Sequence, residues 1–264
     1  MQEREHPGVS PEDEASSGTM RSTQVPYTDS EPRPLASPLA HRLLSLSGVF
    51  PLGAFLVLHL AVNTLALRRE AAYVAAVGAV HRLPGIIAGE WVLVLAPLLV
   101  HASIGMWLVG TRQSLVKQGP YPLRLRIAMR ATGVAAFAFL AMHLLEVRFG
   151  RSNERLGGAE LMTVLDAGLS SIWHGVPWRG AAYLAGTACV TFHFATGLWG
   201  YAVGTRLGHS ERVRRQAGWG AAALGAVIWL LLANVVVFHA TGARLFGGPA
   251  EPERSGSSPC PARD

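Results

Sequence analysis

Five long apolar stretches alternate with polar segments along the chain. They cover residues 43–66, 86–110, 127–147, 180–205 and 218–241, each about 20–26 residues long. A helix of that length spans roughly 30 Å at about 1.5 Å per residue, which is the thickness of the hydrocarbon core of a bilayer. Backbone groups in hydrocarbon must bond within their own segment, so the pattern predicts helices that cross a membrane.

Shorter features refine this prediction. Residues 71–83 and 159–174 carry a helical pattern typical of short interfacial helices. Pro51 and Pro97 fall inside the first two stretches, where prolines are tolerated as kinks. The predicted fold is an all-α membrane protein, with a bundle of five transmembrane helices over residues 39–248.

The two ends of the chain differ in composition from the bundle. Residues 1–38 are rich in Glu, Pro, Ser and Thr and contain no apolar region of the kind that a signal peptide needs. Residues 249–264 repeat that composition. We expect both ends to be disordered tails, the first of them cytoplasmic.

Charge is scarce and unevenly placed. Only 15% of the residues are charged, while 50% are hydrophobic, and the formal net charge is +6. A soluble domain needs charge on the solvent face of every element, so a soluble fold is excluded for most of the chain and nucleic acid is not an expected partner. Arginines crowd the links 111–126 and 206–217, which predicts that these links and the N-terminus are cytoplasmic and the C-terminus is outside.

Four histidines lie deep inside four different apolar stretches. An ionisable group at that depth is costly and is a functional candidate by default. A single one could be a packing histidine bonded to a carbonyl or hydroxyl, but one in each of four helices makes that interpretation weak. The four are His59, His101, His143 and His193.

Counting residues from each helix start divides the four histidines into two levels. His59 and His143 fall on an outer level, and the other two fall on an inner level roughly 10 Å away. Two imidazoles on one iron make a six-coordinate electron-transfer centre. The sequence therefore predicts two haem b groups, with His59 paired to His143 and His101 paired to His193.

The surroundings of these histidines add to the prediction. Gly105 and Gly197 each follow an inner histidine by four residues, so they lie on the same helix face. Either they leave room for a porphyrin or they are small-residue helix contacts. No C-x-x-C-H motif occurs, so haem would be bound non-covalently. Cys189 lies in an apolar stretch and Cys260 in a tail, which excludes a disulfide framework.

The segments around the four histidines resemble a known family. They are similar to the di-haem, five-helix cytochrome b subunit of succinate:quinone oxidoreductases, the succinate dehydrogenases and fumarate reductases, and most of all to the single-anchor type of menaquinone-using bacteria. The likeness covers residues 41–206 in register, whereas the fifth helix matches only in character. The matching segments are HRLLSLSGVFPLGAFLVLHLAVN, APLLVHASIGMWL, RATGVAAFAFLAMHLLEVR and TFHFATGLWGYAV.

The resemblance implies a role in the bacterial cytoplasmic membrane. It assigns His101 and His193 to a proximal haem and the other two histidines to a distal haem. It implies two partners on the cytoplasmic face, a flavoprotein with FAD and an iron–sulfur subunit, so the chain is not catalytic alone. Some fumarate reductases of the family carry a glutamate where this chain has Thr191. This chain therefore lacks the carboxylate that those fumarate reductases use to move protons across the membrane.

Two further groups of site residues are predicted. Haem propionates need cationic or hydroxyl partners, and Ser45, Arg126 and Arg206 stand at inner helix ends. Ser45 and Arg126 fall at propionate positions of the family, whereas Arg206 fits lipid anchoring equally well.

A quinone site near the outer end needs a protonatable group and apolar walls. The candidates are His81, Arg82 and Glu90, with Glu70 as a rival. The alternative is that His81 and Arg82 anchor the chain at the interface and that Glu90 caps its helix.

Two other functions stay open on the residues alone. One is the cytochrome b anchor of another respiratory dehydrogenase or of a hydrogenase. The other is a haem-free transporter whose histidines line a polar path. The absorption bands of b-type haem in purified membranes distinguish the transporter from both cytochromes.

The predicted orientation can be tested with reporter fusions. A reporter after Asp264 should report the outside, and one inserted within residues 113–119 should report the inside, because arginines concentrate in the inner links. Paired alkaline phosphatase and fluorescent-protein fusions measure this. Opposite readings would exchange the proximal and distal haems and leave the histidine pairs intact.

Overall fold

The computed structural model describes residues 38–110, 122–149, 157–204 and 210–247. Within these ranges the chain forms helices joined by short turns, with no strand and one isolated bridge between Trp173 and Val176. The all-α prediction is confirmed. The two predicted tails lie outside the described ranges, apart from Pro38, which begins the first helix.

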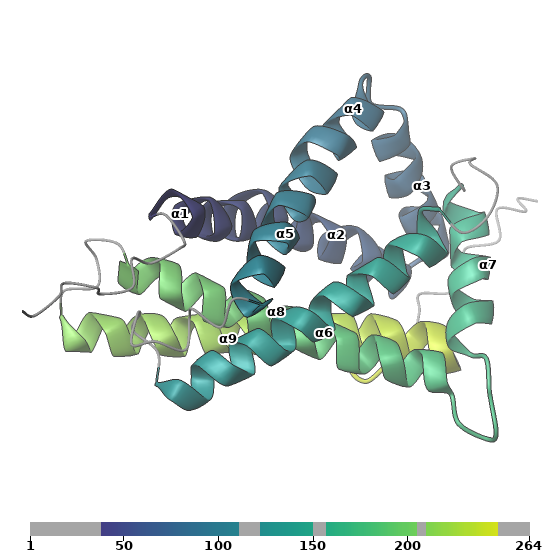
Figure 1. The fold of residues 1–264 in the computed structure, drawn as a ribbon. Coiled ribbons are helices and arrows are strands. Elements are labelled where there is room, and N and C mark those ends of the chain that lie inside the picture. Colours follow the sequence, from purple (N-terminus) through teal and green to yellow (C-terminus); the bar gives the residue numbers. More distant parts are fainter. Residues whose placement is uncertain (1–37, 111–121, 150–156, 205–209, 248–264) are drawn as a thin grey trace, which may run out of the picture. The chain divides into compact units, whose positions relative to one another are not determined.

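Among the residues that the structure describes, four helical stretches are long and apolar enough to cross a membrane. Figure 1 shows the helices that form them. They are Arg42–Ala66, Ile86–Gly110, Leu123–Val147 and Glu211–Thr241. These correspond to four of the five predicted stretches, although the last two begin earlier than predicted. The fifth is helix α8 (Trp178–Gly204), which has 27 residues but is not among the four. Its threonines, its glycines and His193 lower its mean hydropathy.

The first two spans are each built from three helical segments. In chain order the helices are α1 (Pro38–Ser47), η1 (Gly48–Leu52), α2 (Gly53–Ala66), α3 (Glu70–His81), α4 (Ile86–Glu90), η2 (Trp91–Leu95), α5 (Ala96–Gly110), α6 (Leu123–Val147), α7 (Gly158–Leu169), α8 and α9 (Glu211–Thr241). Both η segments are π-helical turns. Pro51 lies in η1, and Pro97 follows η2. Proline lacks an N–H and crowds the carbonyl four residues earlier, and the wider turn accommodates it.

The two short helices predicted in the links are present as α3 and α7. Helix α7 ends at Leu169, before the predicted boundary. The two helices touch at Gly158, where a Cβ atom would lie 2.7 Å from Val74 Cα. Next to this contact Tyr73 is 1% exposed, and burial raises the pKa of its phenol to about 12. The buried residues around it are Ala66, Val77 and Met162.

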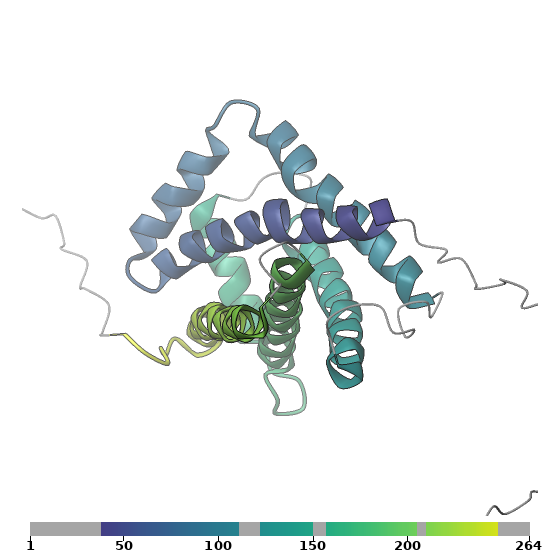
Figure 2. The ribbon, with the colours of Figure 1, turned by 90° about the vertical axis from the view of Figure 1, so that its left-hand side faces the viewer.

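Helix α8 packs along both α6 and α9 (Figures 1 and 2). Small residues allow the close approach to α9, because a Cβ atom on Gly225 would lie 2.8 Å from Ala195 Cβ. Leu60 of the first span packs against Ile228 and Leu232 of α9. The helices keep large apolar side chains on their outer faces, which suits lipid rather than water.

The α8–α9 contact gives a stability prediction. Gly225→Leu should lower the thermal stability of the detergent-purified protein by about 1–3 kcal/mol, because the added side chain collides with Ala195. Gly220→Leu is the matched control on the same helix, where no atom lies within 4 Å of an added Cβ. Thermal unfolding followed by circular dichroism measures both variants. Equal midpoints for the two variants would contradict the tight packing of α8 on α9.

Candidate functional site

Two of the deep histidines face each other between α5 and α8. The ring centroids of His101 and His193 lie 6.0 Å apart, with the planes at 86°. His101 Nδ1 lies 3.0 Å from the carbonyl oxygen of Leu44, and His193 Nδ1 lies 3.0 Å from that of Met129. A carbonyl oxygen only accepts, so each Nδ1 carries the proton and each Nε2 keeps a free lone pair.

The other two deep histidines face each other between α2 and α6. The ring centroids of His59 and His143 lie 5.9 Å apart, with the planes at 80°. Phe55 stacks on His59, and Phe139 stacks on His143. In both helices the aromatic ring comes four residues before the histidine, so one helical turn supports each imidazole.

Two glycines make room for the inner pair. A Cβ atom on Gly48 would lie 2.6 Å from His101 Cε1, and one on Gly133 would lie 2.9 Å from His193 Cε1. An outer histidine follows each glycine ten or eleven residues later, about 15 Å along the helix. The two pairs therefore occupy two levels. Sequence reasoning missed these glycines, although their shared spacing to a histidine was a visible signal.

The two glycines that the sequence analysis singled out, Gly105 and Gly197, are loosely packed. A Cβ atom on Gly105 would meet only Leu44 Cδ1, at 3.9 Å, and one on Gly197 only Met129 Cε, at 4.0 Å, among the described residues. Neither glycine is therefore a close helix–helix contact. The loose packing one turn from each inner histidine agrees with the alternative, room for a flat ring.

The ring separation in each histidine pair is close to that of two imidazoles on opposite sides of one metal ion. A metal–imidazole bond is about 2.0–2.1 Å and a ring nitrogen lies about 1.1 Å from the ring centre, so two opposed imidazoles have centroids about 6.3 Å apart. The described residues contain no cluster of three or more His, Cys, Asp or Glu. A haem would supply the remaining ligands of a metal ion that two imidazoles hold. An Nδ1–H bonded to a carbonyl is also usual for metal-bound histidine.

Tyr183 is a polar neighbour of the outer pair that no motif indicated. Its Oη lies 3.3 Å from His143 Nδ1 and donates a 2.9 Å hydrogen bond to Glu146 Oε2. Arg179 Nε lies 3.9 Å from the other carboxylate oxygen of Glu146. The only sequence signal was the presence of two opposite charges at the ends of neighbouring helices.

The predicted propionate residues lie close to the backbone groups that hold the inner pair. Exposed Ser45 follows Leu44, and half-buried Arg126 comes one turn before Met129 on α6. The serine that approaches the inner pair is Ser47, whose Oγ lies 3.4 Å from His101 Nδ1. The third predicted residue, Arg206, lies outside the described residues.

The predicted quinone residues lie in and after the link between the first two spans. His81 ends α3 and Arg82 follows it, both exposed. Glu90 is half-buried and accepts a 2.7 Å hydrogen bond from Arg148 Nε, which lies just beyond the end of α6. The rival Glu70 is the exposed first residue of α3. The structure thus shows that Arg148 is a partner of Glu90, which the sequence did not indicate.

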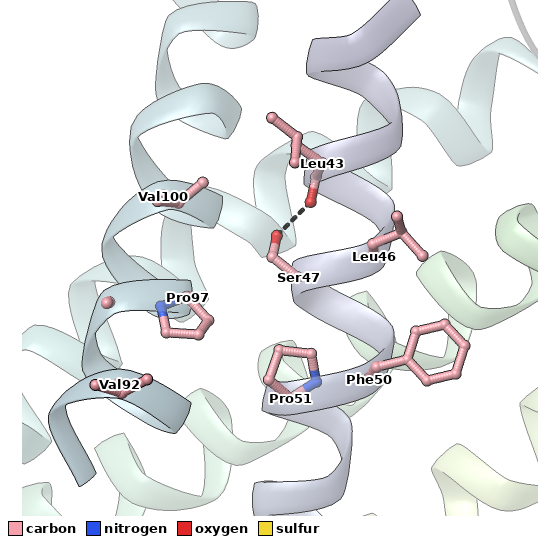
Figure 3. Close-up of a pocket in the computed structure, with 9 residues that line it drawn as sticks. Leu43, Leu46, Ser47, Phe50, Pro51, Val92, Pro97 and Val100 are labelled. Atoms are coloured by element: carbon pink, nitrogen blue, oxygen red, sulfur yellow. Dashed lines mark hydrogen bonds between the residues drawn. The ribbon is translucent and has the colours of Figure 1, made fainter. Parts of the chain in front are cut away.

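An apolar groove of about 520 Å³ lies between the first two spans (Figure 3). Pro51 and Pro97 face each other across it. It suits an acyl or isoprenoid chain, but it offers no proton-exchanging group because none of its lining side chains is titratable. The lining residues are Leu43, Leu46, Ser47, Phe50, Pro51, Val92, Ala96, Pro97 and Val100.

Comparison with known proteins adds an independent line of evidence. No protein-family model matches the chain, and no solved structure matches it. The succinate dehydrogenase cytochrome b558 subunit of Bacillus subtilis (strain 168) is 33% identical over 163 residues, which is 61% of this chain and 77% of that protein. Because the aligned residues are 33% identical and cover 77% of the relative, the chain belongs to the family of succinate dehydrogenase cytochrome b subunits.

Proposed function

We propose that this membrane anchor carries electrons through two haem b groups, between an iron–sulfur subunit and menaquinone. The observation that carries the proposal is the presence of two facing histidine pairs, on four different helices and at two levels. Family membership supports the anchor role. The test is co-purification with succinate-linked quinone reductase activity and with two haems per chain.

In this proposal the chain's own residues orient the ligand nitrogens. His101 and His193 hold the proximal haem, and His59 and His143 hold the distal haem. Bound by these imidazoles, a haem would supply one-electron exchange and would not bind oxygen. The carbonyl oxygens that accept the Nδ1 protons of the inner pair leave each Nε2 with a lone pair that a haem iron could accept.

The partners follow from the same family likeness. A flavoprotein with FAD and an iron–sulfur subunit would dock on the cytoplasmic face of the bacterial inner membrane. The proposed topology has five crossings, with α8 as the fourth, and a cytoplasmic N-terminus. The arginine-rich inner links support this orientation. Ser45, Arg126 and Arg206 are the proposed propionate partners at that face.

We place the quinone near the outer end, at Glu90 with His81 and Arg82. The ion pair between Glu90 and Arg148 supports this choice, because Arg148 lies five residues beyond His143, about 7.5 Å along the helix direction. A half-buried carboxylate and an imidazole can exchange protons with a quinol, as electron transfer at this end requires.

Loss of single haems tests the histidine pairs. His101→Ala and His193→Ala should each lower the haem content from two per chain to one by removing the inner haem. His59→Ala and His143→Ala should remove the outer one, because one imidazole alone leaves the iron without its second axial ligand. Pyridine haemochrome assays and redox titration measure this.

The matched control is His174→Ala, which changes an exposed histidine outside the four spans and should keep both haems. If the His59 and His101 variants lost the same centre, the pairing would be wrong.

Two substitutions test the quinone site. Glu90→Gln and His81→Ala should each lower quinone-linked turnover by about 100-fold, the usual contribution of a proton-transferring group. Succinate reduction of an artificial dye by the soluble subunits should persist. Both haems must first be shown to be present in each variant.

Glu70→Gln is the comparison, because it removes a carboxylate at the other end of α3 and should keep normal turnover. A collapse with Glu70→Gln alone would make that rival the quinone residue. Normal activity in all three variants would move the site elsewhere in the outer leaflet.

A further inference from the structure

A chain of hydrogen bonds leads away from the outer histidine pair. His143 Nδ1 lies 3.3 Å from Tyr183 Oη, which lies 2.9 Å from Glu146 Oε2. Tyr183 is 6% exposed, and Phe139 packs edge-on against its ring at a centroid distance of 5.2 Å. The aromatic contact and the two hydrogen bonds hold the phenol between the imidazole and the carboxylate.

The direction of each hydrogen bond follows from the donor at each atom. The phenol has one proton, and it is donated to the Glu146 carboxylate. The phenol oxygen is then an acceptor toward His143, so Nδ1 of His143 is the donor. His143 Nε2 keeps its lone pair, and the ring of His59 lies 5.9 Å away between centroids.

The inner pair has a different kind of support. His101 and His193 donate to neutral backbone carbonyls, each at 3.0 Å. The outer series of hydrogen bonds ends instead on a carboxylate, so the bond from Tyr183 to Glu146 is charge-assisted and polarises the phenol oxygen that accepts from His143. An acceptor that pulls on the Nδ1 proton raises the basicity of a metal-bound imidazole, and a more basic ligand favours the oxidised metal.

We propose that Tyr183 and Glu146 are positioning residues that lower the reduction potential of the outer haem relative to the value the histidine pair alone would set. The inference rests on the proposed function, since it needs a haem between His59 and His143. A lower potential at the outer haem affects how readily each haem gains or loses an electron. The outer centre gives up its electron to the quinone more readily, while the inner centre stays a better acceptor for electrons from the iron–sulfur side.

The test is a potentiometric titration of the haem absorbance bands in the purified complex. Tyr183→Phe keeps the ring against Phe139 and removes only the hydroxyl. It should raise the ratio of reduced to oxidised outer haem about tenfold at a fixed potential, an upward shift of about 59 mV for one electron. The inner haem should keep its potential, and the bands lost in His59→Ala identify the outer one.

A second variant separates the carboxylate charge from the hydroxyl. Glu146→Gln keeps an acceptor for Tyr183 but removes the charge, so it should shift the outer potential in the same direction and by less. Tyr73→Phe is the matched control, because it removes another buried hydroxyl in a cluster without a haem histidine. It should shift neither haem.

Unchanged potentials in Tyr183→Phe with both haems bound would overturn the proposal, and so would a shift confined to the inner haem. If Tyr183→Phe loses the outer haem, Glu146→Gln decides, since a raised outer potential supports the proposal and an unchanged one overturns it. Failure of the proposed function would give a different result. The wild-type complex would then lack two haems, or succinate would not reduce them.

Discussion

An imidazole buried among apolar helices needs an acceptor for its N–H, and this requirement organises the structure. Three of the four deep histidines satisfy it by reaching a neighbouring helix, through Leu44 O, Met129 O or the Tyr183 phenol. Each bond fixes the rotation of one helix against the next, because an unpaired polar group in this environment costs several kcal/mol. The same bonds leave the opposite ring nitrogens free to bind a metal.

Small and aromatic residues help to position the four imidazole rings at two levels along the helices. Gly48 and Gly133 let the inner rings lie against a helix backbone, and Gly225 lets α9 close on α8. Phe55 and Phe139 stack on the outer rings. Helices in a membrane associate through close packing rather than through the hydrophobic effect, so glycines at these contacts have the greatest influence on geometry.

The two levels differ in the character of their polar support. The inner level uses neutral carbonyls of the backbone, which no side-chain substitution removes directly. The outer level uses the side chains of Tyr183 and Glu146, which are joined by a hydrogen bond. An ion pair between Glu90 and Arg148 lies at the same end of α6. In the proposed electron-transfer role this asymmetry matters, because polar groups bonded to the ligands of a metal tune its reduction potential.

Much of this protein could be predicted from the sequence, because the position of a residue along a hydrophobic helix sets its depth in the membrane. Depth separated His59 and His143 from the other two histidines, and the structure brings the members of each pair to ring-centroid distances of 5.9 and 6.0 Å. Hydropathy leaves open how each helix is rotated about its axis, and contacts between distant residues depend on that rotation. For this reason only the tertiary structure revealed that Gly48 lies under His101, that Tyr183 reaches His143 and that Arg148 meets Glu90.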